Sequence, residues 1–316
     1  DGENVNEWQK RGLIKLTDLL SCPNLIKTNK FDESKCIKVW TATDKLGTYE
    51  KYYLQGEYQS WVPVVLCVPH KHASNQWIVC SQGHNSGLHN SIGMSEEPPY
   101  GEFIPAGDRD YSKWCMNNGI AAACIEHRCF GEREERGLKS RANHGCQDAA
   151  MHALALGRTL LGERLIDIKL LIDFLKENRG ACDFGLLGNS SGGTISILGA
   201  ALLDDIKYCI ASSCFSSLSD SIMSKYHCVD MYIPGIRKYF EMGDIAGLVA
   251  PKKLLLIQGV NDKLFPVSGV RREFDKAQRI FMECSAPDNV ILRIGYGGHR
   301  FYSNLATSGA KKLAVI

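Results

Sequence analysis

Apolar and polar positions alternate in the first quarter of the chain. Residues 36–56 (CIKVWTATDKLGTYEKYYLQG) and 60–69 (SWVPVVLCVP) carry β-branched and aromatic side chains interleaved with polar ones. This period of two predicts antiparallel strands near the N-terminus.

From residue 76 onward the pattern changes to short apolar runs separated by helix-like segments. The runs QWIVCSQG (76–83), IAAACIEHR (120–128), FGLLGNS (184–190), KYCIASSCF (207–215), KKLLLIQGVND (252–262) and NVILRIGYGGH (289–299) predict buried strands. Strands that alternate with helices are typical of a parallel sheet with helices on both faces. We therefore predict an α/β fold with a mostly parallel central sheet.

Helical periodicity marks a long amphipathic segment at 153–180, which ends in Arg-Gly, and shorter segments at 192–203 and 269–281. Residues 1–30 are predicted to form an N-terminal helical arm. The polar stretch 129–152 is predicted to be a loop or small cap, and 214–245 a second wall of a pocket. Without repeats or a clear linker, residues 1–316 are predicted to form a single domain.

Composition narrows the functional classes. The chain of 316 residues has a net charge of +2 with its basic residues spread out, so no nucleic-acid partner is expected. Its longest apolar runs are far shorter than a membrane span. Thirteen scattered cysteines without a CxxC pair predict reduced thiols and a cytoplasmic location. The chain begins at Asp1 with no apolar signal region, and trimming or a removed leader both remain open.

The stretch GNSSGG contains the strongest chemical signal. Gly188-Asn189-Ser190-Ser191-Gly192 fits the spacing G-x-S-x-G centred on Ser190, between a predicted strand and a predicted helix. In that context a sharp turn exposes the central serine as a nucleophile. The alternative is a glycine-rich turn that only packs a helix against the sheet. The sequence lacks the glycine-rich motifs that a phosphate-binding loop requires. The glycosylation sequon at Asn189 is interpreted as a chance match.

A serine nucleophile needs a base and an acid, which follow it in chain order in this architecture. His299 follows the last predicted strand and is the predicted base. Asp262 follows the preceding strand and is the predicted acid, with Asp220 as the alternative. His227, the other histidine after Ser190, is interpreted as a packing or surface residue.

Two backbone N–H groups are expected to hold a developing oxyanion. One is that of Ser191, directly after the nucleophile, and the other that of His84, in the loop CSQGHNSGLHN (80–90). The pairs His84/His89 and His70/His72 have no cysteine or carboxylate at ligand spacing, so no metal site is expected.

The motifs QGHNSG, EHRCFGER, LGRTLLGERLIDIKLLIDFL, GNSSGG, QGVNDKLFP and GGHRF occur in this order. With them, residues 60–305 resemble the α/β-hydrolase superfamily, and most closely the acetyl xylan esterase and dienelactone-hydrolase-like group of bacterial esterases. Ser190 stands where dienelactone hydrolases proper have cysteine, and Gln82 replaces the more usual histidine of the oxyanion loop.

The resemblance implies a serine esterase without a cofactor that acts on short acyl groups, such as acetyl on a carbohydrate or another small molecule. Similar esterases often form homo-oligomers. Glu126 and Arg128 are expected to be structural, and Trp114 to belong to the core. Two further functions stay open from the residues: a peptidase or amidase on the same triad, and a non-catalytic binding protein on a hydrolase scaffold.

Overall fold

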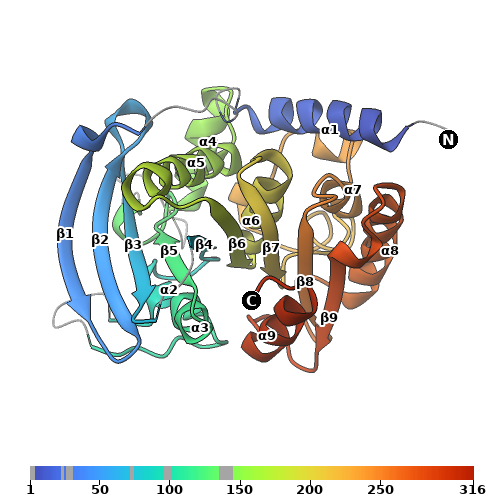
Figure 1. Cartoon of the computed structure of the whole chain (residues 1–316). Helices are drawn as coiled ribbons and strands as arrows, with labels where there is room; N and C mark the ends of the chain where they lie inside the picture. The colour runs from blue at the N-terminus through green and yellow to red at the C-terminus, as the bar shows by residue number, and fades with distance from the viewer. Residues whose placement is uncertain (1–3, 23–24, 26–30, 72–74, 96–100, 135–144) are drawn as a thin grey trace.

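The computed structural model describes residues 4–22, 25, 31–71, 75–95, 101–134 and 145–316. Within these ranges a single mixed sheet forms the centre of the molecule, in the order β1-β2-β3-β5-β4-β6-β7-β8-β9 (Figure 1). The strands are β1 (Cys36–Thr43), β2 (Gly47–Gln55), β3 (Trp61–Pro69), β4 (Gln76–Ser81), β5 (Ala121–Ile125), β6 (Asp183–Asn189), β7 (Ile206–Ser212), β8 (Lys253–Gly259) and β9 (Val290–Gly295).

The pairing of the strands changes direction once across the sheet. β1, β2 and β3 pair antiparallel, and β3 also pairs antiparallel with β5. From β5 through β4, β6, β7 and β8 to β9, every pair is parallel. The predicted mostly parallel sheet with antiparallel N-terminal strands is therefore confirmed.

Helices cover both faces of the sheet, as predicted. They are α1 (Val5–Leu20), α2 (His89–Ile92), α3 (Tyr111–Asn117), α4 (Cys146–Ala155), α5 (Leu160–Arg179), α6 (Ser191–Leu202), α7 (Met242–Gly247), α8 (Val267–Glu283) and α9 (Ser303–Lys312). In β4, Trp77 and Val79 pack into one core with α1, α5, α6, α7 and α8, whereas Ile78 and Cys80 pack into a second core with α2, α3 and α9. This alternation follows from the period of two along a strand.

The prediction of one helix over 153–180 is wrong. The segment begins within α4, breaks after residue 155 and continues as α5 from residue 160. Gly157 has φ 69° in the break, and Thr159 caps α5 by accepting the Gly162 N–H at 3.0 Å. Apolar positions continue through the break, so periodicity alone conceals it. The predicted loop or cap at 129–152 thus contains the first part of α4, and residues 135–144 lie outside the described ranges.

The predicted N-terminal arm is helical over α1, and it packs against the second half of the chain. Gln9 Nε2 donates to the carbonyl oxygens of Gly247 at 3.1 Å and Ala250 at 2.8 Å. At the other end of α1, the carbonyl of Leu20 accepts the Thr159 hydroxyl at 2.7 Å. Residues 1–3, 23–24 and 26–30 of the arm lie outside the described ranges.

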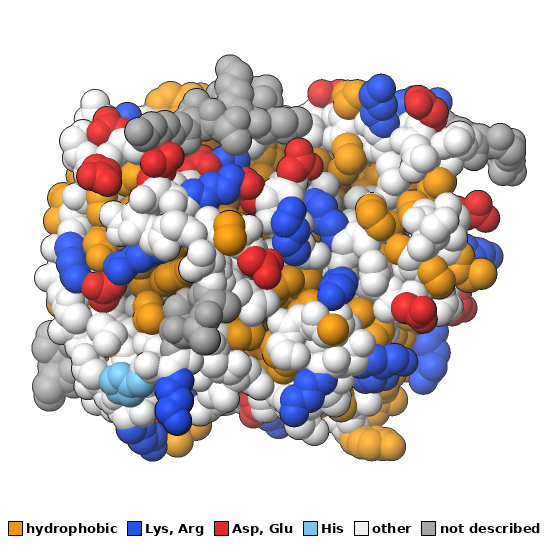
Figure 2. Space-filling view, viewed as in Figure 1, with side chains coloured by type: hydrophobic (Ala, Val, Ile, Leu, Met, Phe, Trp, Pro, Cys, Tyr) orange, Lys and Arg blue, Asp and Glu red, His pale blue; other side chains and the backbone are white. Residues whose placement is uncertain are grey.

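The surface charge, the cysteines and the helix lengths bear on the expectations drawn from composition. Basic and acidic side chains are interspersed on the face drawn in Figure 2. All thirteen cysteines lie among the described residues as free thiols, and most are buried. No helix in the described part of the chain is long and apolar enough to cross a membrane.

Candidate functional site

Ser190 occupies the sharp turn between β6 and α6. Its backbone has φ 58° and ψ −130°, a conformation that residues other than glycine rarely adopt. Its N–H donates to the carbonyl of Ser212 at 2.9 Å, and its carbonyl accepts the Thr194 N–H at 3.0 Å. The surrounding hydrogen bonds thus hold Ser190 in a strained conformation, which is a feature common at functional sites.

Glycines surround this turn because three backbones meet there. A Cβ on Gly188 would lie 2.3 Å from the carbonyl oxygen of Gly192, and a Cβ on Gly192 would lie 2.1 Å from that of Ser81. The loop after β4 approaches as closely, since a Cβ on Gly83 would lie 2.7 Å from the carbonyl oxygen of Asn189. The glycine spacing read from the sequence therefore has a steric cause.

Asp262 and His299 come together from the ends of β8 and β9. His299 Nδ1 lies 2.8 Å from Asp262 Oδ2. The two turns are joined by backbone bonds from Val260 N to Gly295 O at 2.8 Å and from Asn261 N to Gly297 O at 3.0 Å. With its Nδ1 proton donated to the carboxylate, the neutral imidazole has Nε2 as its proton acceptor.

The Asp262 carboxylate is buried and accepts hydrogen bonds from four donors. Oδ2 accepts from His299 and from Gln258 Nε2 at 3.0 Å, and Oδ1 accepts the N–H groups of Leu264 at 2.9 Å and Phe265 at 3.2 Å. Burial acts to raise the pKa of Asp262, but the bonds from His299 and the two amides outweigh it and lower this pKa. Asp262 is therefore held as the ionised partner of His299.

Ser190 and His299 line the same cavity, which has a volume of about 600 Å³. That volume is in the range of small-molecule sites. Phe265 stacks on the His299 ring with centroids 5.9 Å apart. The segments predicted as pocket walls contribute lining residues, with Gln147 from 129–152 and Tyr226, His227, Cys228, Val229 and Met231 from 214–245.

Glu126 holds the loop that carries His84. Its carboxylate accepts the Leu88 N–H at 3.1 and 3.0 Å and the side-chain amide of Gln82. Burial raises the pKa of Glu126 to about 7. The loop is thus fixed at both ends, with His84 in the cavity lining between them.

Ser191 begins α6, so its backbone N–H belongs to the first turn, where no intrahelical acceptor exists. Its hydroxyl is buried and has no hydrogen-bond partner in the described part of the chain. Ser191 lines the cavity, and its backbone N–H is the group that the sequence predicts for an oxyanion.

Comparisons with known proteins address the fold. The chain is 26% identical over 223 residues to YtaP of Bacillus subtilis (strain 168), an inferred hydrolase, covering 68% of this chain and 71% of YtaP. The structure matches an acetyl xylan esterase, so assigned by inference, from Bacteroides fragilis NCTC 9343 with a TM-score of 0.73, at 17% identity, over 92% of this chain and 75% of that one. It also matches Acetyl Xylan Esterase 1 from Thermoanaerobacterium sp. JW/SL YS485 with a TM-score of 0.59, at 13% identity, over 98% and 93%. No family model matches the sequence.

The chain has the α/β-hydrolase fold. The resemblance identified from the sequence motifs is confirmed at this level, and the structural neighbours are esterases.

Two cavity residues could not be predicted from the sequence. Arg109 donates from Nε to Asn189 Oδ1 at 3.3 Å and from Nη2 to the His299 carbonyl at 3.4 Å. His227 was interpreted as a packing or surface residue, yet it lines the cavity, and its ring contacts Phe265 edge-on at 5.2 Å. Neither residue belongs to a motif, so only the folded chain places them at the cavity.

Asp220, the alternative acid, and the expected structural residues Arg128 and Trp114 are not part of the cavity lining. Asp220 pairs with Arg272 at 2.6 Å, whereas His299 bonds Asp262. Arg128 bonds Asp167 at 3.0 Å. Trp114 is buried, as expected for a core residue.

A cluster of potential metal ligands lies beside His84, although the spacing of residues in the sequence did not predict it. His89 bonds Ser86 Oγ at 3.0 Å, and His72 lies outside the described ranges. His84 instead lies with Cys146, Cys228 and Asp230, and its Nε2 is 3.1 Å from Asp230 Oδ1. Burial acts to lower the pKa of His84, but its bonds to Asp230 and Cys228 outweigh this and raise it to about 9.

Proposed function

We propose that the chain is a serine esterase that hydrolyses carboxylic esters with short acyl groups through Ser190, His299 and Asp262. The observation that carries this proposal is the 2.8 Å bond between His299 and Asp262, together with the strained Ser190, which lines the same cavity as His299. A serine, an imidazole and an oriented carboxylate are the parts that nucleophilic acyl transfer requires.

In the first half-reaction Ser190 Oγ attacks the ester carbonyl carbon, while His299 Nε2 removes the hydroxyl proton. Asp262 holds the imidazole in the tautomer that can accept this proton, and it stabilises the imidazolium that forms. The C–O bond to the alcohol then breaks, and His299 returns the proton to the leaving alkoxide. Ser190 is left as an acyl ester.

In the second half-reaction water attacks the acyl carbon and gives its proton to His299. The acid leaves and Ser190 regains its proton. In both steps the backbone N–H groups of Ser191 and His84 stabilise the oxyanion. Loss of one such donor raises the barrier by about 3–4 kcal/mol.

The names of the structural neighbours suggest the first substrates to test. Two of them are acetyl xylan esterases, so acetylated carbohydrate is the proposed natural class, with small acetyl esters as models. Leu264, Phe265 and Met231 in the lining offer apolar surface for a short acyl group. A cytoplasmic location remains part of the proposal, on the basis of the thirteen free cysteines.

The test is hydrolysis of p-nitrophenyl acetate by Ser190→Ala, with Ser191→Ala as the matched control in the same turn. Ser190→Ala should lose nearly all turnover and no longer react with a fluorophosphonate probe. Ser191→Ala should keep both, because it retains the backbone N–H and removes only an unpartnered hydroxyl. Unchanged turnover in folded Ser190→Ala would refute the proposal.

A further inference from the structure

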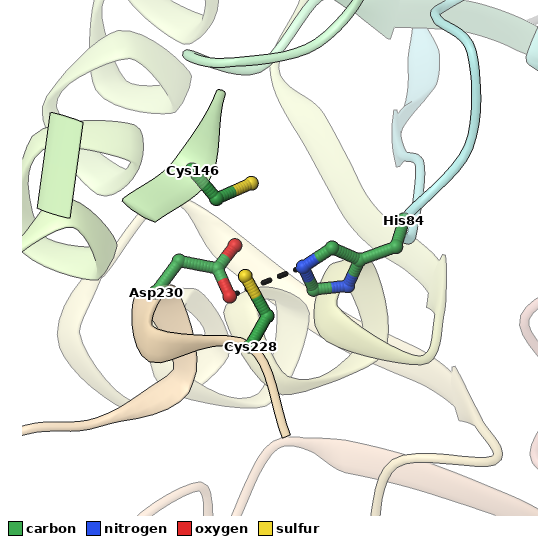
Figure 3. A group of neighbouring side chains, drawn as sticks. All are labelled: His84, Cys146, Cys228 and Asp230. Carbon is green, nitrogen blue, oxygen red and sulfur yellow. Dashed lines mark hydrogen bonds and ion pairs between the residues drawn. The ribbon is translucent and has the colours of Figure 1, made fainter. Parts of the chain in front are cut away.

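Four side chains from three separate segments converge beside the cavity (Figure 3). His84 comes from the loop after β4, and Cys146 begins α4. Cys228 directly precedes the short helical turn Val229–Met231, and Asp230 lies within it. Each offers one ligand atom, and these four atoms lie within 4.8 Å of one another. None of these side chains has a part in the proposed ester chemistry, which uses His84 only through its backbone.

We propose that His84, Cys146, Cys228 and Asp230 bind one zinc ion. Two sulfurs, one imidazole nitrogen and one carboxylate oxygen form a set that Zn²⁺ accepts in tetrahedral sites. Because all four positions are supplied by the protein, the site is of the closed, structural kind. It would join three segments that all contribute to the cavity wall.

The spacing of the four ligand atoms can be compared with that of a tetrahedral zinc site. Zinc bonds of about 2.0–2.3 Å place neighbouring ligand atoms about 3.3–3.8 Å apart. The edge between His84 Nε2 and Asp230 Oδ1 is already 3.1 Å long. The other edges are all within 4.8 Å, so zinc binding would shorten each of them by about 1.5 Å at most.

Charge balance supports a divalent ion with two thiolates. Arg164 is fully buried, and its Nη1 lies 2.7 Å from Asp230 Oδ2, so the guanidinium neutralises this carboxylate. Two thiolates then balance Zn²⁺, while the imidazole is neutral, and the buried group carries no net charge. The two thiols and the protonated His84 ring each release one proton to solvent as the ion binds.

The surroundings also fit a bound ion. Arg164 orients Asp230 so that Oδ1 faces His84, as hydrogen bonds to ligating carboxylates do in known metal sites. Phe130 packs edge-on against the His84 ring at 5.3 Å. His84 and Cys228 both line the cavity, and this gives an ion a path from solvent.

The first experiment needs no substitution. The whole chain, reduced and freed of metal with a chelator, is titrated with Zn²⁺ and separately with Co²⁺. We expect about one bound equivalent of either ion, and an intense thiolate-to-cobalt charge-transfer band in the near ultraviolet. The absence of this band, or no metal retained after gel filtration, would overturn the proposal.

The variants assign the ligands. Cys146→Ser and Cys228→Ser should each weaken zinc binding at least about 100-fold, since even changes next to the ligands reduce affinity about 10- to 100-fold. Cys182→Ser is the matched control, because Cys182 is exposed and outside the cluster, and it should bind like the unmodified chain. Equal affinity in all three variants would overturn the assignment.

Discussion

Replacement of Asp262 by asparagine tests the orientation of the imidazole, because the hydrogen-bond partners of Asp262 are all donors. An amide of the same shape must turn one of its two ends from acceptor to donor. With the amide NH₂ in place of Oδ1, it would oppose the buried N–H groups of Leu264 and Phe265. That arrangement leaves two backbone donors unpaired, each at about 1–3 kcal/mol.

With the NH₂ in place of Oδ2, the conflict can be relieved. It then faces His299 Nδ1 and Gln258 Nε2, and His299 can shift its proton from Nδ1 to Nε2. Gln258 Nε2 also donates to the Phe265 carbonyl at 3.0 Å, so this amide keeps a partner when it loses its bond to residue 262. This second orientation is the more stable one. It leaves His299 with a proton on Nε2, the nitrogen that must accept a proton as the base.

We therefore expect Asp262→Asn to fold but to lower kcat for p-nitrophenyl acetate about 10⁴-fold, as the wrong tautomer does in serine hydrolases with a triad. This corresponds to about 5 kcal/mol in the barrier. KM should change little, because the cavity lining does not include Asp262.

Asp220→Asn is the control, because Asp220 bonds Arg272 away from the imidazole. A surface change of this kind should keep activity within about twofold. A decrease of less than tenfold in Asp262→Asn, or an equal decrease in both variants, would refute the tautomer argument.

Three further outcomes are expected. Because the pKa of Glu126 is raised to about 7 from a usual 4.5, its stabilising effect is complete below pH 4.5 and is lost as pH rises through 7. The melting temperature of Glu126→Gln, relative to that of the unmodified chain, should therefore rise between pH 5 and 8. A difference in melting temperature that stays constant over this range would contradict the prediction. Gly192→Ala should destabilise the fold by about 3 kcal/mol or more in urea denaturation, because the new Cβ meets backbone at 2.1 Å, whereas Gly56→Ala, with its nearest atom at 3.4 Å, should not. Arg109 lines the cavity, and no carboxylate is found among the described lining residues, so its guanidinium can bond a carboxylate of the substrate. Arg109→Gln should therefore reduce kcat/KM about tenfold for a p-nitrophenyl ester with a free carboxylate, but not for a neutral ester of equal length.

The parts of the site that could be predicted from sequence are those set by local backbone geometry. Ser190, Asp262 and His299 each follow a strand, and the carboxyl ends of parallel strands meet at one edge of the sheet. The turn around Ser190 requires glycines at fixed spacing, so the sequence motif itself predicts the turn. In the structure His299 bonds Asp262, and Ser190 and His299 line the same cavity. Their catalytic roles remain a proposal.

The parts that could not be predicted depend on distant segments. The cluster of His84, Cys146, Cys228 and Asp230 has no ligand spacing except Cys228-x-Asp230, so a search of neighbouring positions misses it. Arg109 reaches the cavity from a loop without a motif. The break between α4 and α5 was missed because a glycine and a capping threonine interrupt the backbone without interrupting the apolar pattern.

The position of α1 has a consequence for synthesis of the chain. Its partners at Gly247 and Ala250 are about 240 positions later than Gln9, and the longer separation is 241. At about 5–20 residues per second, a ribosome needs about 12–50 s to make that length. Throughout this interval the Gln9 end of α1 lacks these two partners and is open to chaperones and proteases. Docking of this end of α1 therefore waits for synthesis of the segment that follows α7.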